Sequence, residues 1–161
     1  MKNLTEAILG ILFAFILYSI FSKVSFSLTL VFNAFSLVVL YFALTRGEIF
    51  GACMGAICGL VQDSFSLGVF GIGGLAMTTM GFMAGYISRK INVTPFLRNV
   101  VFIFIMLSLE LGLWAFLYSY IFMEKLYTRS GILLFQPLVT AVIGSIIFRF
   151  IPKLRRKTST S

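Results

Sequence analysis

Apolar runs, each interrupted by charged or turn-forming residues, dominate the chain. They cover residues 6–22, 27–45, 47–62, 69–88, 99–123 and 132–151. A helix needs about 20 apolar residues to cross about 30 Å of hydrocarbon, so the first run is marginal and the third is short. The pattern predicts an all-α integral membrane protein with six transmembrane helices, which form one domain over residues 1–152.

The distribution of positive charge predicts the orientation of these helices. With the N-terminus in the cytoplasm, the outer segments contain only three of the 13 basic residues, Lys23, Lys125 and Arg129. Because cytoplasmic loops are enriched in Lys and Arg, we expect both termini inside. Glu6 in the n-region and the lack of a small-residue cleavage site favour a retained first helix over a signal peptide. Residues 153–161 are expected to form a disordered basic tail against anionic lipid.

The composition excludes several functional classes. The chain is 60% hydrophobic and 11% charged, against about 25% charged residues in soluble domains, so the bilayer must be part of its solvent. The net charge of +8 then reflects residues that flank the membrane, and no nucleic-acid partner is expected. The chain has no His, and Cys53 and Cys58 form no zinc or disulfide pattern, so they are expected to be small packing residues. We therefore expect no catalytic residue, metal or cofactor.

Two carboxylates, Asp63 and Glu110, are expected at membrane depth. By helical rise, Asp63 lies roughly 25 Å beyond the inner boundary, just beneath the outer one, where the glycine-rich segment 64–74 can bend or re-enter the membrane. Glu110 lies roughly 18 Å in, near the middle of the bilayer. A charged carboxylate there costs at least about 2.5 kcal/mol. Glu110 must therefore face protein or water, or carry a proton.

Two amides share this depth. Asn33 lies early in the second run and Gln136 early in the sixth, and both runs are expected to start at the outer face. One hypothesis is that Asn33, Asp63, Glu110 and Gln136 line a polar pocket that opens outward. The alternative is that each side chain makes a hydrogen bond between helices, worth about 0.6 kcal/mol.

Glycines recur every four residues in the third and fourth runs. Gly51, Gly55 and Gly59 share one helix face, and Gly81 and Gly85 form a second pair. Faces without side chains allow close helix approach. The two faces are expected either to pack on each other or to receive a helix from another protein, and the two possibilities can coexist.

The residues from Gly55 to Tyr86 resemble the rod shape-determining MreD family. The shared pattern is a glycine pair followed by Leu60 and Asp63, then Gly71 and Leu75-Ala76, and a span that ends at Gly85-Tyr86. Arg46, the chain length, the six-run layout and the basic tail also fit. The signature positions are Gly55, Gly59, Leu60, Asp63, Gly71 and Leu75.

The resemblance implies a component of the wall-elongation complex in the bacterial cytoplasmic membrane. Its expected partners are a single-span protein of the MreC type, a SEDS glycosyltransferase, a class B penicillin-binding protein and an actin-like filament system. The family is also similar to the six-helix S subunits that capture vitamins for ECF transporters.

Three functions compete at this point. The first is a non-enzymatic scaffold in which Asp63 binds backbone donors at the bend; alternatively, Asp63 merely ends its helix. The second is a substrate-binding subunit of a small-molecule transporter, or a binder of a lipid-linked wall precursor. An enzyme is the least favoured, because nothing in the sequence places Asp63 and Glu110 together and no activated nucleophile is evident.

Overall fold

A computed structural model describes residues 2–24, 32–65, 70–91, 96–122 and 131–150, and this part of the chain is helical without strands. The helices are α1 (Lys2–Val24), α3 (Ala34–Arg46), α4 (Glu48–Phe65), α5 (Ile72–Lys90), α6 (Phe96–Phe122) and α7 (Gly131–Phe150). Each corresponds to one predicted run, which confirms the all-α class. The tail 153–161 lies outside the described residues.

Of the helix boundaries that differ from the predicted runs, two affect the predicted site residues. α3 starts at Ala34, because the side chain of Asn33 accepts a hydrogen bond from the backbone N–H of Ser36 and caps the helix. α4 continues to Phe65, so Asp63 lies in its last turn and does not end it.

Helix length tests the membrane prediction in part. By length and composition, the segment Phe96–Ile121 of α6 can cross a bilayer. The other strongly apolar stretches are shorter, namely Ile8–Ile20, Ala34–Arg46 and Gln136–Phe148. One spanning helix is therefore supported among the described residues, and six spans stay a prediction.

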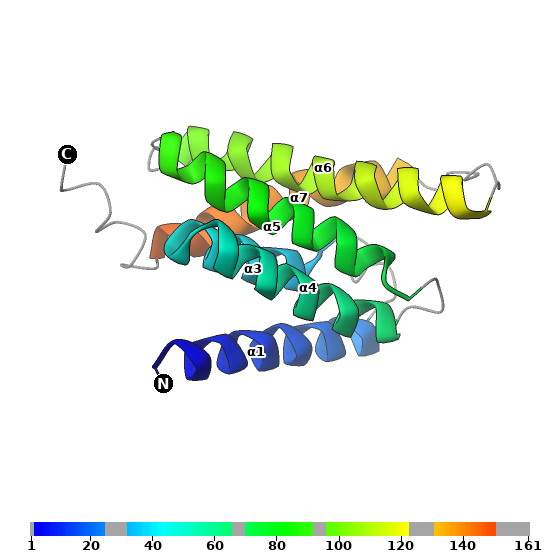
Figure 1. Cartoon of the computed structure of the whole chain (residues 1–161), viewed down its shortest axis with the longest axis horizontal. Coiled ribbons are helices and arrows are strands. Elements are labelled where there is room, and N and C mark those ends of the chain that lie inside the picture. The colour runs from blue at the N-terminus through cyan, green and yellow to red at the C-terminus, as the bar shows by residue number, and fades with distance from the viewer. Residues whose placement is uncertain (1, 25–31, 66–69, 92–95, 123–130, 151–161) are drawn as a thin grey trace.

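α3 lies at the centre of the bundle. It contacts α1, α4, α5 and α7, while α6 packs on α5 and α7. Figure 1 shows that the start of α1 and the end of α7 lie at the same end of the bundle. Most of α3 is buried, and its side chains form much of the core together with Met77 and Met80 of α5 and Ile103 of α6.

Large apolar side chains cover the outside of the bundle. They are well exposed on all sides, for example Phe13 on α1, Ile49 on α4, Leu75 on α5, Leu97 on α6 and Leu138 on α7. Large exposed apolar surfaces on a protein mark contact with membranes or partners. The exterior therefore fits hydrocarbon better than water.

Candidate functional site

The glycines of α4 and α5 bring the two backbones into direct contact. A Cβ atom at Gly51 would lie 2.5 Å from the carbonyl oxygen of Gly81, and one at Gly59 would lie 2.5 Å from the Cα of Gly74. A Cβ at Gly55 would overlap the carbonyl group of Met77, and one at Gly85 would overlap the backbone of Glu48. Any side chain at these positions would push the helices apart.

This contact decides between the two uses of the glycine faces. Gly51, Gly55, Gly59, Gly81 and Gly85 are all buried between α4 and α5. The faces pack on each other, so the interpretation that they receive a helix from another protein is wrong for these five residues. We call this closely packed unit the α4–α5 pair.

Asp63 joins the two helices at the end of the pair near the loop. Its Oδ2 atom accepts hydrogen bonds from the backbone N–H groups of Gly71, at 2.8 Å, and Gly74, at 3.1 Å. These N–H groups belong to the N-cap residue and to the first turn of α5, where the helix offers no acceptors for them. Asp63 thus caps α5 from α4, and its carboxylate lies at the positive end of the α5 dipole. This geometry agrees with the interpretation that Asp63 binds backbone donors at the bend.

Two glycines allow this cap to form. Gly71 precedes α5 with φ of 101°, a left-handed conformation that favours glycine. A Cβ at Gly73 would collide with the carboxylate of Asp63. The carboxylate of Asp63 can therefore approach the start of α5 because Gly71 and Gly73 lack side chains.

An ion pair joins the opposite end of the α4–α5 pair. Glu48 starts α4 and Arg89 lies in the last turn of α5, and the Arg89 Nη1 and Glu48 Oε1 atoms are 2.8 Å apart. Sequence reasoning missed this contact, although an acid at the start of one helix and a base at the end of its antiparallel neighbour could have indicated it. The pair is thus held at both ends.

Glu110 lies in a second buried polar group. Its Oε1 atom accepts hydrogen bonds from Ser36 Oγ, at 2.7 Å, and from Asn33 Nδ2, at 3.4 Å. The backbone N–H of Asn33 donates to Thr140 Oγ1 at 3.4 Å. The Glu110 cluster, defined as Asn33, Ser36, Glu110 and Thr140, therefore joins α3, α6 and α7. Sequence reasoning missed Ser36 and Thr140, and the Asn-x-x-Ser spacing of a helix cap was the available signal for Ser36.

The structure divides the predicted polar pocket. Asn33 and Glu110 come together, whereas Asp63 bonds to α5 at the α4–α5 loop. Gln136 is half-buried and lies one helical turn before Thr140 on α7. The four residues thus do not act as one set, because Asp63 already has backbone partners within the described residues.

The remaining predicted positions lie at the surface of the α4–α5 pair. Leu60 and Leu75 are 41% and 61% exposed, and Leu60 packs over Gly74. Gly71 has open space where a Cβ would be. Within the described residues, no group of three or more acidic or Cys side chains is placed to hold a metal ion.

Comparison of the chain with protein-family models, curated proteins and solved structures gives no match.

The Glu110 cluster gives a testable contribution to stability. Glu110→Ala leaves Ser36 and Asn33 without their acceptor, and we expect a loss of about 2 kcal/mol in the free energy of unfolding. Glu110→Gln keeps an acceptor oxygen and should lose less than half of that amount. Unfolding in mixed detergent micelles measures both values. Equal losses in the two variants would contradict a role based on hydrogen bonding.

Proposed function

We propose that the chain is a multi-pass protein of the bacterial cytoplasmic membrane, with six transmembrane helices and both termini in the cytoplasm. The apolar exterior and the long apolar α6 support a membrane location. The shared end of the bundle for the start of α1 and the end of α7 agrees with termini on one side (Figure 1). The bias of positive charge supports the cytoplasmic assignment.

Within that membrane, the chain acts as a non-enzymatic scaffold and regulator of the cell-wall elongation complex that maintains rod shape. The observation that carries this proposal is the α4–α5 pair. Four of the signature positions that resemble the MreD family, Gly55, Gly59, Asp63 and Gly71, lie in or beside the contact between its two helices. Such positions fix the geometry of a helix pair and supply no nucleophile or acid–base pair, as a scaffold requires.

The other two signature positions supply the partner surface. Leu60 on α4 and Leu75 on α5 are 41% and 61% exposed, and we call the surface that they form the outer ridge of the pair. A single transmembrane helix of an MreC-type protein packs on this ridge, whose position depends on the fixed α4–α5 geometry. Through that protein, the chain joins the SEDS glycosyltransferase, the class B penicillin-binding protein and the actin-like filaments.

Purification from native membranes tests this function. A photoreactive amino acid at Leu75 should crosslink to a single-span protein, and mass spectrometry should recover wall-synthesis enzymes with it. The same amino acid at Leu97, which is 78% exposed on α6, is the matched control and should crosslink only to lipid. Equal crosslinking to proteins at both positions, or recovery without any wall-synthesis protein, would contradict the proposal.

The Glu110 cluster favours a second candidate, a binder of a small molecule such as a vitamin or a lipid-linked wall precursor. A buried carboxylate with hydroxyl and amide neighbours can recognise a polar ligand. A tightly retained small molecule that is lost in Glu110→Ala, together with an energising ATPase among the recovered proteins, would favour this candidate over the scaffold.

A further inference from the structure

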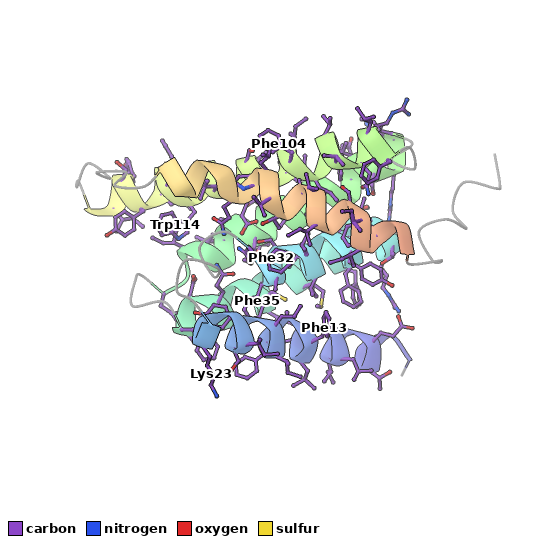
Figure 2. The ribbon with its side chains drawn as sticks, turned by 180° about the vertical axis from the view of Figure 1, so that it is seen from behind. Phe13, Lys23, Phe32, Phe35, Phe104 and Trp114 are labelled. Atoms are coloured by element: carbon purple, nitrogen blue, oxygen red, sulfur yellow. The ribbon has the colours of Figure 1, made fainter. Side chains whose placement is uncertain are left out.

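An apolar groove of about 750 Å³ lies between α1, α3 and α7. Its lining includes Leu9 and Phe13 of α1, Phe32 before α3, Val38 of α3 and Phe148 of α7. Figure 2 shows the molecule from this side, with Phe13 and Phe32 labelled. We call it the α1/α3/α7 groove. Its volume lies within the range of about 300–1,000 Å³ that is typical of ligand sites.

The way α1 packs explains the groove. Small residues seat α1 on α3, since Ala14 is fully buried and Gly10 lies against Phe42. The large side chains of Leu9 and Phe13 stay more than half exposed at the edge of the groove. Apolar residues therefore occupy both the packed and the open sides of α1, as expected for a helix with hydrocarbon around it.

The length of the groove matches one leaflet of a bilayer. Its lining extends along α3 from Ala34 to Phe42, about 12 Å at about 1.5 Å per residue, and Phe32 just before the helix lengthens it to about 15 Å. Half of the hydrocarbon thickness is also about 15 Å. An extended acyl chain that enters from the Arg46 side would therefore fit along the groove without crossing the bilayer midplane.

Opposite charges lie at one end of the groove. Glu6 belongs to its lining, and the guanidinium of Arg46 forms an ion pair with Glu6 at the last turn of α3. The Arg46 Cζ atom also lies 5.2 Å from the centre of the Phe50 ring, which holds the guanidinium in place. Arginine matches the geometry of phosphate oxygens, and a carboxylate attracts an ammonium group. The Glu6–Arg46 pair thus complements a headgroup that carries both a phosphate and an ammonium group.

From these features, we infer that the α1/α3/α7 groove binds one zwitterionic phospholipid as a resident ligand. Its acyl chain fills the groove, its phosphate contacts Arg46, and its ammonium group contacts Glu6. This inference does not rest on the scaffold function, because no residue of α4 or α5 lines the groove. Bound lipid would also hold α1, which packs mainly on α3, against the rest of the bundle.

Native mass spectrometry of the full chain, reconstituted with phosphatidylethanolamine and released in a detergent that strips peripheral lipid, tests the inference. The unmodified chain should retain one phospholipid. Val38→Trp narrows the groove, and Arg46→Gln removes the phosphate contact. We expect each change to lower retention about tenfold, the effect of losing about 1.4 kcal/mol of binding free energy. Glu6→Gln keeps the guanidinium and should retain lipid, with weaker preference for an ammonium headgroup.

Matched controls separate binding from folding. Val101→Trp changes an exposed valine of α6 in the same way, and Arg89→Gln breaks the second ion pair, which does not line the groove. Both controls should retain the phospholipid, and all variants should keep the helix content of the unmodified chain. The inference is overturned if the unmodified chain retains no lipid, or if the groove and control variants lose it equally. It is also overturned if the chain, taken directly from native membranes, is found bound to a polypeptide in the groove. The sign of that outcome is that Val38→Trp abolishes the binding of the polypeptide and Val101→Trp does not.

Discussion

Asp63→Ala lowers the free energy of unfolding by about 3 kcal/mol. The substitution leaves the N–H groups of Gly71 and Gly74 without their acceptor, which costs about 1–3 kcal/mol for the buried Gly74 and less for the half-buried Gly71. Gly74 is buried, so water cannot easily replace the carboxylate there. Reversible unfolding in mixed detergent micelles measures the loss. Amide hydrogen exchange at Gly71 and Gly74 should accelerate first, because the damage starts at the first turn of α5.

Asp63→Asn is the matched variant. The asparagine side chain keeps an acceptor oxygen for both N–H groups and loses only the charge beside the helix dipole, worth about 0.3–1 kcal/mol. We therefore expect a loss of about 1 kcal/mol, and near-normal recovery of the proposed wall-synthesis partners. If Asp63→Ala unfolds like the unmodified chain, the cap does not hold the α4–α5 pair together. If Asp63→Asn is as damaging as Asp63→Ala, charge rather than hydrogen bonding controls the contact.

The α4–α5 pair is the part of the molecule that sequence reasoning described best. Gly51, Gly55 and Gly59 recur at the helical period, and a short loop makes α4 and α5 antiparallel neighbours, so close packing follows from local pattern alone. Asp63 contacts residues only eight and eleven positions away. The cap was therefore within reach of an argument from spacing. The extent of α4 was not, because hydropathy stops at Gln62 while the helix continues to Phe65.

The Glu110 cluster could be predicted from the sequence only in part. Helical rise placed Asn33 and Glu110 at a similar depth, and they do meet, 77 positions apart in sequence. Depth says nothing about which way a side chain points around its helix, so Asp63 was grouped with them wrongly and Thr140 was missed. The α1/α3/α7 groove lay beyond prediction for a related reason. It depends on how α1 sits beside α7, and neither helix has a pattern that specifies the other.

Gly55→Ala tests the close approach of α4 and α5 and should have an effect as large as that of Asp63→Ala. The new methyl group would overlap the carbonyl group of Met77, and the obstacle is backbone, which cannot rotate away. The helices must then separate, and we expect a loss of about 3 kcal/mol in the free energy of unfolding. Crosslinking from Leu75 to the proposed partner helix should fall with it, because the outer ridge moves when the two helices separate.

Gly112→Ala is the control for this experiment, since Gly112 also lies within a helix but has open space where the methyl group would go. There the substitution removes only the flexibility of glycine, and helix propensity predicts a gain of up to about 1 kcal/mol. The same chemical change should thus destabilise at one glycine and stabilise at the other. If Gly55→Ala behaves like Gly112→Ala, the glycines are not needed for close packing, and the proposed role of the α4–α5 pair is contradicted. A lower free energy of unfolding for Gly55→Ala alone, with weaker crosslinking at Leu75, would show that assembly with the partner depends on the geometry of the α4–α5 pair. This follows because the substitution changes no residue of the outer ridge.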